Sequence, residues 1–166
     1  MKTSTTLLLL FLFLSSTYTA TFAQAPENNA PKQLYKDKND LVAQAKKVTT
    51  GINFEDFKKL YDENDQTLYI DIRTETETEQ GCIPGAVLIP RGVLEFLIAK
   101  KEAWEDKKQP MPAKYESFIV YCRSGNRAAV AAKSLQELGY ANVKYLDSGW
   151  KEWHEKYPEL IELPEE

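Results

Sequence analysis

The stretch of sequence that decides the fold is residues 117–139, SFIVYCRSGNRAAVAAKSLQELG. It begins with an apolar run, residues 117–121, which favours a buried strand. Residues 128–138 are rich in strong helix formers, and Gly139 directly after them is typical of a helix end. Only residues 122–127 lie between the two elements. The stretch therefore predicts a strand that leads through a short loop into a helix.

The same alternation of strand and helix extends in both directions along the chain. Further strands are expected at residues 68–72, 86–89 and 143–146, and helices at residues 41–47, 54–61, 92–101 and 150–157. Residues 74–80 alternate Thr and Glu, which is typical of a solvated loop. Because strands that alternate with helices pair in parallel, the pattern predicts an α/β fold with helices on both faces of a parallel sheet.

Composition and charge fit one globular domain and narrow its partners. The chain has 166 residues, and one domain commonly holds roughly 100–200. Its 21 basic and 25 acidic residues give a net charge of −4, so no basic field exists to hold nucleic acid. Two cysteines and one histidine cannot complete a zinc site of four thiolate and imidazole ligands. Neither a metal nor a cofactor is expected.

The first 25 residues are typical of a secretory signal peptide. Lys2 precedes the apolar run of residues 7–14, and small residues lead to candidate cleavage sites after Ala23 or Ala25. The run is far shorter than the roughly 20 apolar residues that a membrane span needs. We therefore expect an exported protein, periplasmic or secreted, without a membrane span. Its expected parts are a signal peptide (1–23), a polar linker (24–47), a folded domain (48–160) and an acidic tail (161–166).

Cys122 is the candidate nucleophile, because it follows the most apolar strand and precedes a helix. Ligands of open parallel sheets bind beyond the carboxyl ends of the strands. Main-chain N–H groups and the positive end of a helix dipole stabilise a thiolate at such a position. Arg123 and Arg127 add positive charge, and Gly125 allows a tight loop. The alternative is an inert cysteine that is buried as a small apolar side chain.

Four ordered motifs give the chain a family resemblance. Residues 122–127, Cys-Arg-Ser-Gly-Asn-Arg, resemble the active-site loop of rhodanese-like sulfurtransferases. Asp71-Ile72-Arg73, the segment 81–86 (Gly-Cys-Ile-Pro-Gly-Ala) and the segment 146–150 (Leu-Asp-Ser-Gly-Trp) occur in the order shown by that family. The resemblance covers roughly residues 48–157. It implies a rhodanese-like fold with a five-stranded parallel sheet.

The resemblance also implies a double-displacement reaction. The Cys122 thiolate would take the outer sulfur of a small anionic donor such as thiosulfate, and the resulting persulfide would pass this sulfur to a thiol or to cyanide. The residues implied to bind the substrate and the persulfide are Arg123, Ser124, Gly125, Asn126 and Arg127. Asp71 and Arg73 are implied to support the site, and Arg73 with Glu77 resembles a family ion pair.

Three positions depart from the family pattern. The position of Cys82 is usually His, that of Ser148 is often Gly, and Thr78 stands where an aromatic residue is frequent. Cys82 is either a core residue or a second thiol near the site. We expect it to be an unreactive thiol that does not pair with Cys122.

Three other functions remain open from the sequence. A cysteine phosphatase has a similar loop, but its pattern is Cys-x5-Arg, whereas Cys122 and Arg127 form the narrower Cys-x4-Arg. A non-enzymatic binding or regulatory module is the second alternative, although such modules often lack the cysteine. The third is a redox protein that uses Cys82 with Cys122.

Overall fold

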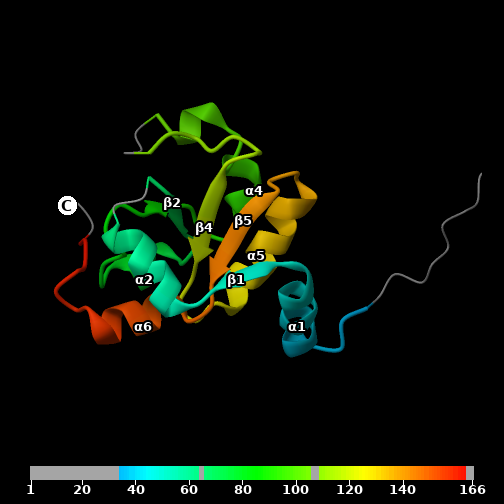
Figure 1. The fold of residues 1–166 in the computed structure, drawn as a ribbon. Coiled ribbons are helices and arrows are strands. Elements are labelled where there is room, and N and C mark those ends of the chain that lie inside the picture. Colours follow the sequence, from blue (N-terminus) through cyan, green and yellow to red (C-terminus); the bar gives the residue numbers. More distant parts are fainter. Residues whose placement is uncertain (1–33, 64–65, 106–108, 164–166) are drawn as a thin grey trace, which may run out of the picture. The chain divides into compact units, whose positions relative to one another are not determined.

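The sheet has five strands, all parallel, in the order β1-β5-β4-β2-β3. The computed structural model describes residues 34–63, 66–105 and 109–163 (Figure 1). The strands are β1 (Thr50–Ile52), β2 (Leu68–Asp71), β3 (Val87–Leu88), β4 (Ser117–Tyr121) and β5 (Asn142–Leu146). The expected α/β fold class is thus confirmed. The central strand is β4, with which the stretch 117–139 begins.

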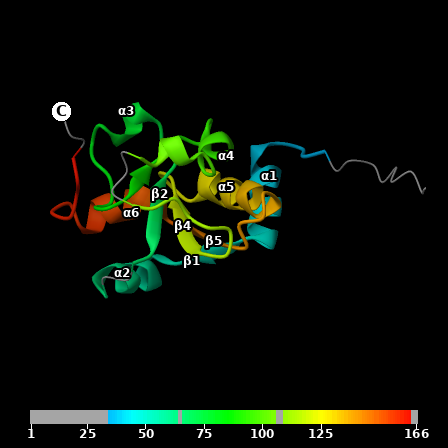
Figure 2. The same cartoon turned by 90° about the horizontal axis from the view of Figure 1, so that it is seen from above.

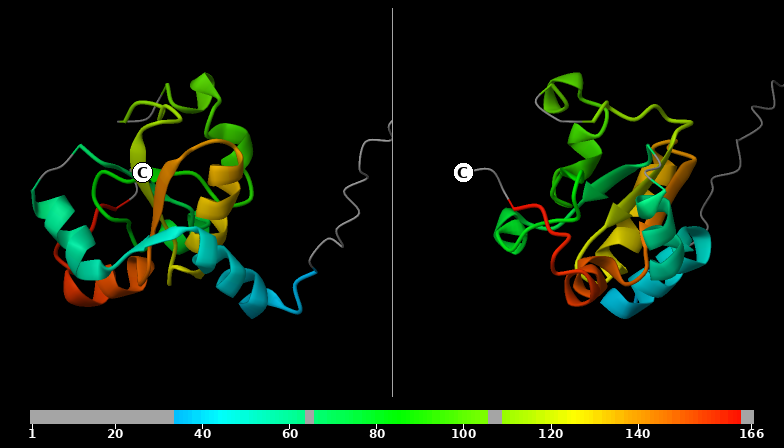
Figure 3. Two further views of the ribbon diagram at one scale, coloured as in Figure 1. Left: turned by 45° about the vertical axis from the view of Figure 1, so that its right-hand side comes forward. Right: turned by 60° about the vertical axis from the view of Figure 1, so that its left-hand side comes forward.

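Helices cover both faces of this sheet, as the alternation predicts. They are α1 (Lys38–Val48), α2 (Phe54–Asp62), α3 (Glu75–Thr78), α4 (Leu94–Leu97), α5 (Asn126–Glu137) and α6 (Gly149–Lys156), with a 3₁₀ turn at Lys101–Ala103. Figure 2 shows α1, α4 and α5 on one side of the strands and α2 and α6 on the other. The two views of Figure 3 show the same arrangement.

Each face of the sheet has its own apolar core. Along β4, Phe118 and Val120 pack on the α5 side with the buried alanines of that helix. Ile119 and Tyr121 pack on the opposite side with Phe57 and Trp153 of α2 and α6. This alternation is the two-residue period of a strand. Because both faces are buried, β4 reads as a continuous apolar run in the sequence.

The amino-terminal boundary differs from the expected one. The predicted linker 24–47 overlaps α1, whose Ala45 is fully buried and which packs against α5. The side chain of Asp37 caps this helix by accepting from the N–H groups of Asn39 and Asp40. The helix expected at 41–47 thus exists and begins three residues earlier, but it belongs to the folded domain and not to a linker. The expected signal peptide and residues 24–33 lie outside the described residues.

The carboxyl-terminal boundary differs too. Cys82 and Glu162 form an antiparallel bridge, in which each N–H donates to the other residue's carbonyl oxygen (2.8 and 3.1 Å). The Glu162 carboxylate also accepts from the N–H of Gly85 at 2.7 Å. Residues 161–163 of the expected acidic tail are therefore part of the fold.

No helix among the described residues is long and apolar enough to cross a membrane.

Two local predictions also needed correction. Residues 74–80 contain the short helix α3 rather than only a loop, because Thr74 and Glu77 form a capping box. The helix expected at 92–101 is shorter, with α4 at 94–97 and a separate 3₁₀ turn after it.

Candidate active site

Cys122 lies at the carboxyl end of the central strand. β4 ends at Tyr121, which is in register with Asp71 at the end of β2. Cys122 and the segment after Asp71 therefore meet at one edge of the sheet, where parallel α/β folds bind ligands. The Cys122 residue is only 1% exposed. Only a slender group can approach a thiol that is covered to this extent.

Two glycines let the nucleophile loop, residues 122–127, pack directly against the turn before α6. Gly125 has a φ of 77°, and a Cβ there would collide with the main-chain carbonyl of Asp147. Gly149 has a φ of 64°, and a Cβ there would collide with the carbonyl oxygen of Cys122. Both the conformation and the space thus require glycine. The loop shape depends on main-chain contacts between two separate segments.

The nucleophile loop presents a row of unused main-chain donors. Within the described part of the chain, no protein acceptor is bonded to the N–H groups of residues 123–128. The last of these groups belong to the first turn of α5, where a helix has no internal acceptors. Consecutive N–H groups of this kind stabilise an anion. The loop therefore has the donors that a thiolate or a persulfide anion requires.

Arg127 at the end of the loop is held by Glu77. Its two terminal nitrogens donate to the two carboxylate oxygens at 2.7 and 2.6 Å, and the side chains are 40% and 31% exposed. Hydrogen bonding from Arg127 lowers the pKa of Glu77 from 4.5 to about 2. The same hydrogen bonds raise the pKa of Arg127, and the negative charge of a Cys122 thiolate raises it further. Arg127 thus stands near the nucleophile, but a carboxylate already neutralises its charge.

Arg123 differs from Arg127 in having no partner. It is exposed, and its guanidinium has no hydrogen bond or ion pair with any residue that the structure describes. Of the two arginines expected to bind an anionic substrate, Arg123 is the one with an available charge. Ser124 and Asn126 are also exposed, whereas Gly125 is buried.

Asp71 and Arg73 form a buried ion pair beneath the site. Both side chains are 1% exposed, and the Arg73 guanidinium donates to the Asp71 carboxylate at 2.6–3.1 Å. Arg73 also donates to the carbonyl oxygens of Glu77 and Gly81 at 2.9 and 2.8 Å. The predicted Arg73–Glu77 ion pair is therefore wrong: Arg73 binds the main chain of Glu77, and the Glu77 carboxylate binds Arg127. All three guanidinium nitrogens are bonded, so Arg73 joins β2 to α3 and to the loop at Gly81.

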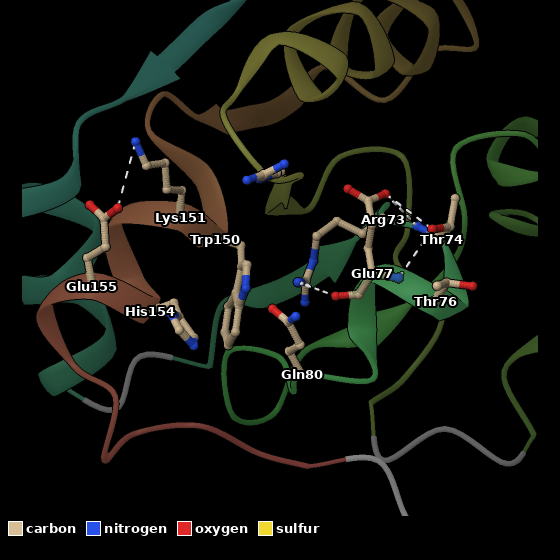
Figure 4. A pocket seen from close by; sticks show the side chains of 10 residues that line it. Arg73, Thr74, Thr76, Glu77, Gln80, Trp150, Lys151, His154 and Glu155 are labelled. Atoms are coloured by element: carbon tan, nitrogen blue, oxygen red, sulfur yellow. Dashed lines mark hydrogen bonds and ion pairs between the residues drawn. The ribbon is translucent and has the colours of Figure 1, made fainter.

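A cavity of about 460 Å³ opens beside the nucleophile loop, and Arg123 contributes to its lining (Figure 4). One side, here called the α6 wall, consists of Trp150, Lys151, His154 and Glu155. The other side, here called the α3 wall, consists of Thr74, Thr76, Glu77 and Gln80. Arg73 lies between them, with its guanidinium 4.4 Å from the centre of the Trp150 ring. Cys122 does not line the cavity; the lining begins at the next residue.

Of the cavity residues outside the nucleophile loop, the sequence indicated Arg73 and Glu77, and it did not indicate the polar residues of α6 or the neutral residues of the α3 wall. His154 was expected to be an exposed helix residue, and Thr76 and Gln80 were part of an expected loop. The available signal was the spacing of His154, three residues after Lys151 and four after Trp150, which places His154 next to each of them on a helix. Among the described residues, no group of three or more Asp, Glu, His and Cys side chains could hold a metal ion.

Cys82 lies in the loop before β3, partly buried. Among the described residues neither Cys82 nor Cys122 is in a disulfide. Cys82 lies near the Tyr121 hydroxyl, which accepts from the N–H of Ile83 at 3.2 Å. Burial raises the pKa of Tyr121 well above its ordinary value, and the neighbouring Asp71 and Cys82 raise it further.

Residues 53–156 match the Rhodanese-like domain family. The chain belongs to this family. The match spans more than half of the protein and contains every element of the site, from Asp71 to the α6 wall. The family assignment made from the four motifs is therefore confirmed.

Individual relatives support the assignment. This rhodanese-like chain is 30% identical to a putative mitochondrial thiosulfate sulfurtransferase of Schizosaccharomyces pombe, over 66% of this chain and 82% of that protein. It is also 30% identical to a sulfurtransferase of Allochromatium vinosum, over 64% of this chain and 89% of the relative. The structure of a human single-domain sulfurtransferase superposes with a TM-score of 0.59 at 22% identity, covering 65% of this chain and 97% of the human one, and this likeness concerns the fold.

Proposed function

We propose that this rhodanese-like protein is a sulfurtransferase that carries a sulfane sulfur on Cys122. The observation that carries the proposal is the position of this thiol, at the carboxyl end of β4, where it opens a loop with six unused N–H groups. The names of the two sulfurtransferase relatives support the same class of reaction.

The first half of the reaction loads the cysteine. The Cys122 thiolate attacks the outer sulfur of thiosulfate, a new S–S bond forms, and the original S–S bond breaks. Sulfite leaves with the electron pair of that bond, so no external oxidant or reductant takes part. The attack needs a thiolate and an acceptable leaving group, and it needs no separate general base.

The second half returns the cysteine to its starting state. A thiolate or cyanide attacks the outer sulfur of the Cys122 persulfide and becomes a persulfide or thiocyanate. Cys122 leaves as a thiolate with the electrons of the broken S–S bond. The N–H groups of residues 123–128 stabilise the negative charge in both states of the cysteine, as an oxyanion hole does for oxygen.

Mass spectrometry of the intact protein after treatment with thiosulfate tests this proposal. The expected result is the added mass of one sulfur atom, located on Cys122, together with one equivalent of sulfite. Cyanide should then remove the added mass. Absence of the adduct on a folded protein would contradict the proposal, and hydrolysis of an aryl phosphate by Cys122 would favour the phosphatase alternative.

We also propose that the protein is exported after cleavage of its leader, which rests on the sequence pattern of residues 1–25. The test is to express the full chain and determine the amino terminus and compartment of the product. A mature chain that begins at Gln24 or Pro26 outside the cytoplasm is the expected result. An uncleaved chain in the cytoplasm would contradict it.

A further inference from the structure

We propose that the cavity between the α6 wall and the α3 wall selects the sulfur acceptor, and that this acceptor is a small thiol bearing a carboxylate. The inference rests on the proposed sulfurtransferase function. It assigns Lys151, together with Arg123, to recognition of the acceptor's negative group.

The size of the cavity points to an organic molecule. Its volume of about 460 Å³ lies within the roughly 300–1,000 Å³ of ordinary small-molecule sites. Thiosulfate and cyanide each have only a few non-hydrogen atoms and would leave most of this space to water. An organic thiol with a carbon chain and further polar groups fills it better.

The charges of the lining favour an acceptor with a negative group. Asp71 already neutralises Arg73, and Arg127 already neutralises Glu77. Of the remaining charged groups, Arg123 has no ion pair among the described residues, and Lys151 has only a loose one with Glu155. The Lys151–Glu155 distance is 3.7 Å and the two side chains are 61% and 60% exposed. The cavity lining therefore has two available positive charges, Arg123 and Lys151, against the single carboxylate of Glu155.

Neutral groups of the lining suit the rest of such a molecule. Figure 4 shows the Gln80 amide between Trp150 and Glu77. The side chains of Gln80 and Thr76 have no hydrogen-bond partner in the described part of the chain. Trp150 and His154 add flat rings whose centres are 5.4 Å apart. An acceptor with amide or hydroxyl groups beside its carboxylate would engage these donors and rings.

The α6 wall is fixed relative to the nucleophile. The N–H of Trp150 donates to the carbonyl oxygen of Cys122 at 2.8 Å, and that of Lys151 donates to the carbonyl oxygen of Arg123 at 3.0 Å. These bonds hold the first turn of α6 against the nucleophile loop. A carboxylate that binds Lys151 and Arg123 is therefore held at a set distance from the reacting sulfur, which favours the correct approach of the acceptor thiol.

Burial of the nucleophile favours a small acceptor over a protein. Cys122 is 1% exposed, and the persulfide extends it by one S–S bond of about 2.05 Å. A cysteine on a flat protein surface cannot reach a sulfur at this depth. The thiol end of a small, slender molecule can reach it while the carboxylate stays on the wall.

The test separates the two halves of the reaction. Cys122 is first loaded with thiosulfate, and loading is verified by mass and by sulfite release. Excess thiosulfate is removed, and the loss of the added sulfur is timed with 3-mercaptopropionate and with its uncharged methyl ester. The ratio of the two second-order rate constants, acid over ester at equal thiolate concentration, is the readout. The wild-type protein is compared with Lys151→Glu and with Lys156→Glu as control, since Lys156 is on the same helix but outside the lining.

The expected result is a three- to tenfold lower acid-to-ester ratio in Lys151→Glu, because reversal of a half-exposed charge acts on the charged acceptor only. Lys156→Glu should keep the wild-type ratio, and added salt should lower the wild-type ratio. An unchanged ratio in Lys151→Glu would overturn the subsite while leaving the sulfurtransferase function in place. A persulfide that passes its sulfur to protein thiols and not to small ones would also overturn the subsite. Failure to load Cys122 in the wild type would overturn the sulfurtransferase function itself.

Discussion

The nucleophile loop and the α6 wall bound the same cavity but are built from different parts of the chain. The loop acts through its main chain: its N–H groups are the anion donors, and Gly125 and Gly149 are needed for its close packing. The α6 wall acts through its side chains, of which Lys151, His154 and Glu155 are exposed. A substitution that disturbs the main chain of the loop therefore affects every substrate. A substitution on the wall changes the preference among substrates.

The largest expected effect is that of Cys122→Ser, which removes the nucleophile without changing the loop. A serine hydroxyl stays protonated near neutral pH, so thiosulfate:cyanide turnover should fall by more than about 10³-fold. Thermal unfolding should stay close to that of the wild type. Activity above about one per cent of wild type would show that the chemistry does not depend on this thiol.

The next largest effect is expected for Gly125→Ala, because this substitution disturbs the main-chain packing of the loop. A methyl group there would collide with the Asp147 carbonyl, and the alanine would have to adopt the left-handed φ of Gly125. We expect a loss of about 3 kcal/mol in the free energy of unfolding and at least tenfold lower turnover. Gly85→Ala is the matched control, since Gly85 has a φ of 79° but nothing within 4 Å of the added Cβ. It should lose only the conformational cost, about 1 kcal/mol, and equal losses in the two variants would exclude the close contact as the cause.

Substitutions of the two arginines of the loop should distinguish binding of an anionic donor from support of the loop conformation. Arg123→Gln should lower kcat/KM for thiosulfate by about fivefold, and less for an uncharged sulfur donor, because its charge is available to an anion. Arg127→Gln should lower kcat/KM for both donors by a similar factor. The charge of Arg127 is already paired with Glu77, and the loss of this pair loosens the loop. A thiosulfate-selective loss in Arg127→Gln would instead support the role that the sequence suggested for Arg127, that of binding the anionic donor.

Glu77→Gln should have a smaller effect, and its effect should depend on pH. The folded-state pKa of Glu77 is about 2, below the ordinary value of 4.5. Its ion pair therefore stabilises the fold above about pH 4.5, and this contribution is lost as the pH falls from 4.5 to 2. The pair is half-exposed, so we expect the variant to be less stable by about 1 kcal/mol at pH 7. This difference from the wild type should shrink in urea titrations as the pH falls toward 3.

The smallest effect is expected for Cys82→Ala. Cys82 is partly buried and lies outside the cavity lining, so turnover should stay within about twofold of wild type. The purified wild-type protein should titrate two thiols without reductant. A count of zero, with activity restored by reductant, would show that Cys82 and Cys122 form a disulfide.

The fold and the nucleophile could be predicted because both depend on local sequence. An apolar strand, a short loop and an alanine-rich helix are signalled by adjacent residues, and Cys122 lies at their junction. The contacts that complete the site are not local. Arg127 and Glu77 are 50 positions apart, and whether Glu77 pairs with Arg127 or with Arg73 depends on where α3 begins. Lys151, His154 and Glu155 of the α6 wall were not predicted, because an exposed polar side chain on a helix resembles any solvated residue until the cavity is known.

The bridge between Cys82 and Glu162 has a practical consequence for work with the chain. Gly81, next to that bridge, supplies one of the carbonyl oxygens that hold Arg73, and Arg73 lies against Trp150 in the cavity. A chain that is truncated before Glu162, for example to attach an affinity tag, would therefore lose the bridge and a support of the active site. A chain that extends beyond Leu163 keeps the bridge, so the choice of the carboxyl terminus for expression bears on whether the purified protein is active.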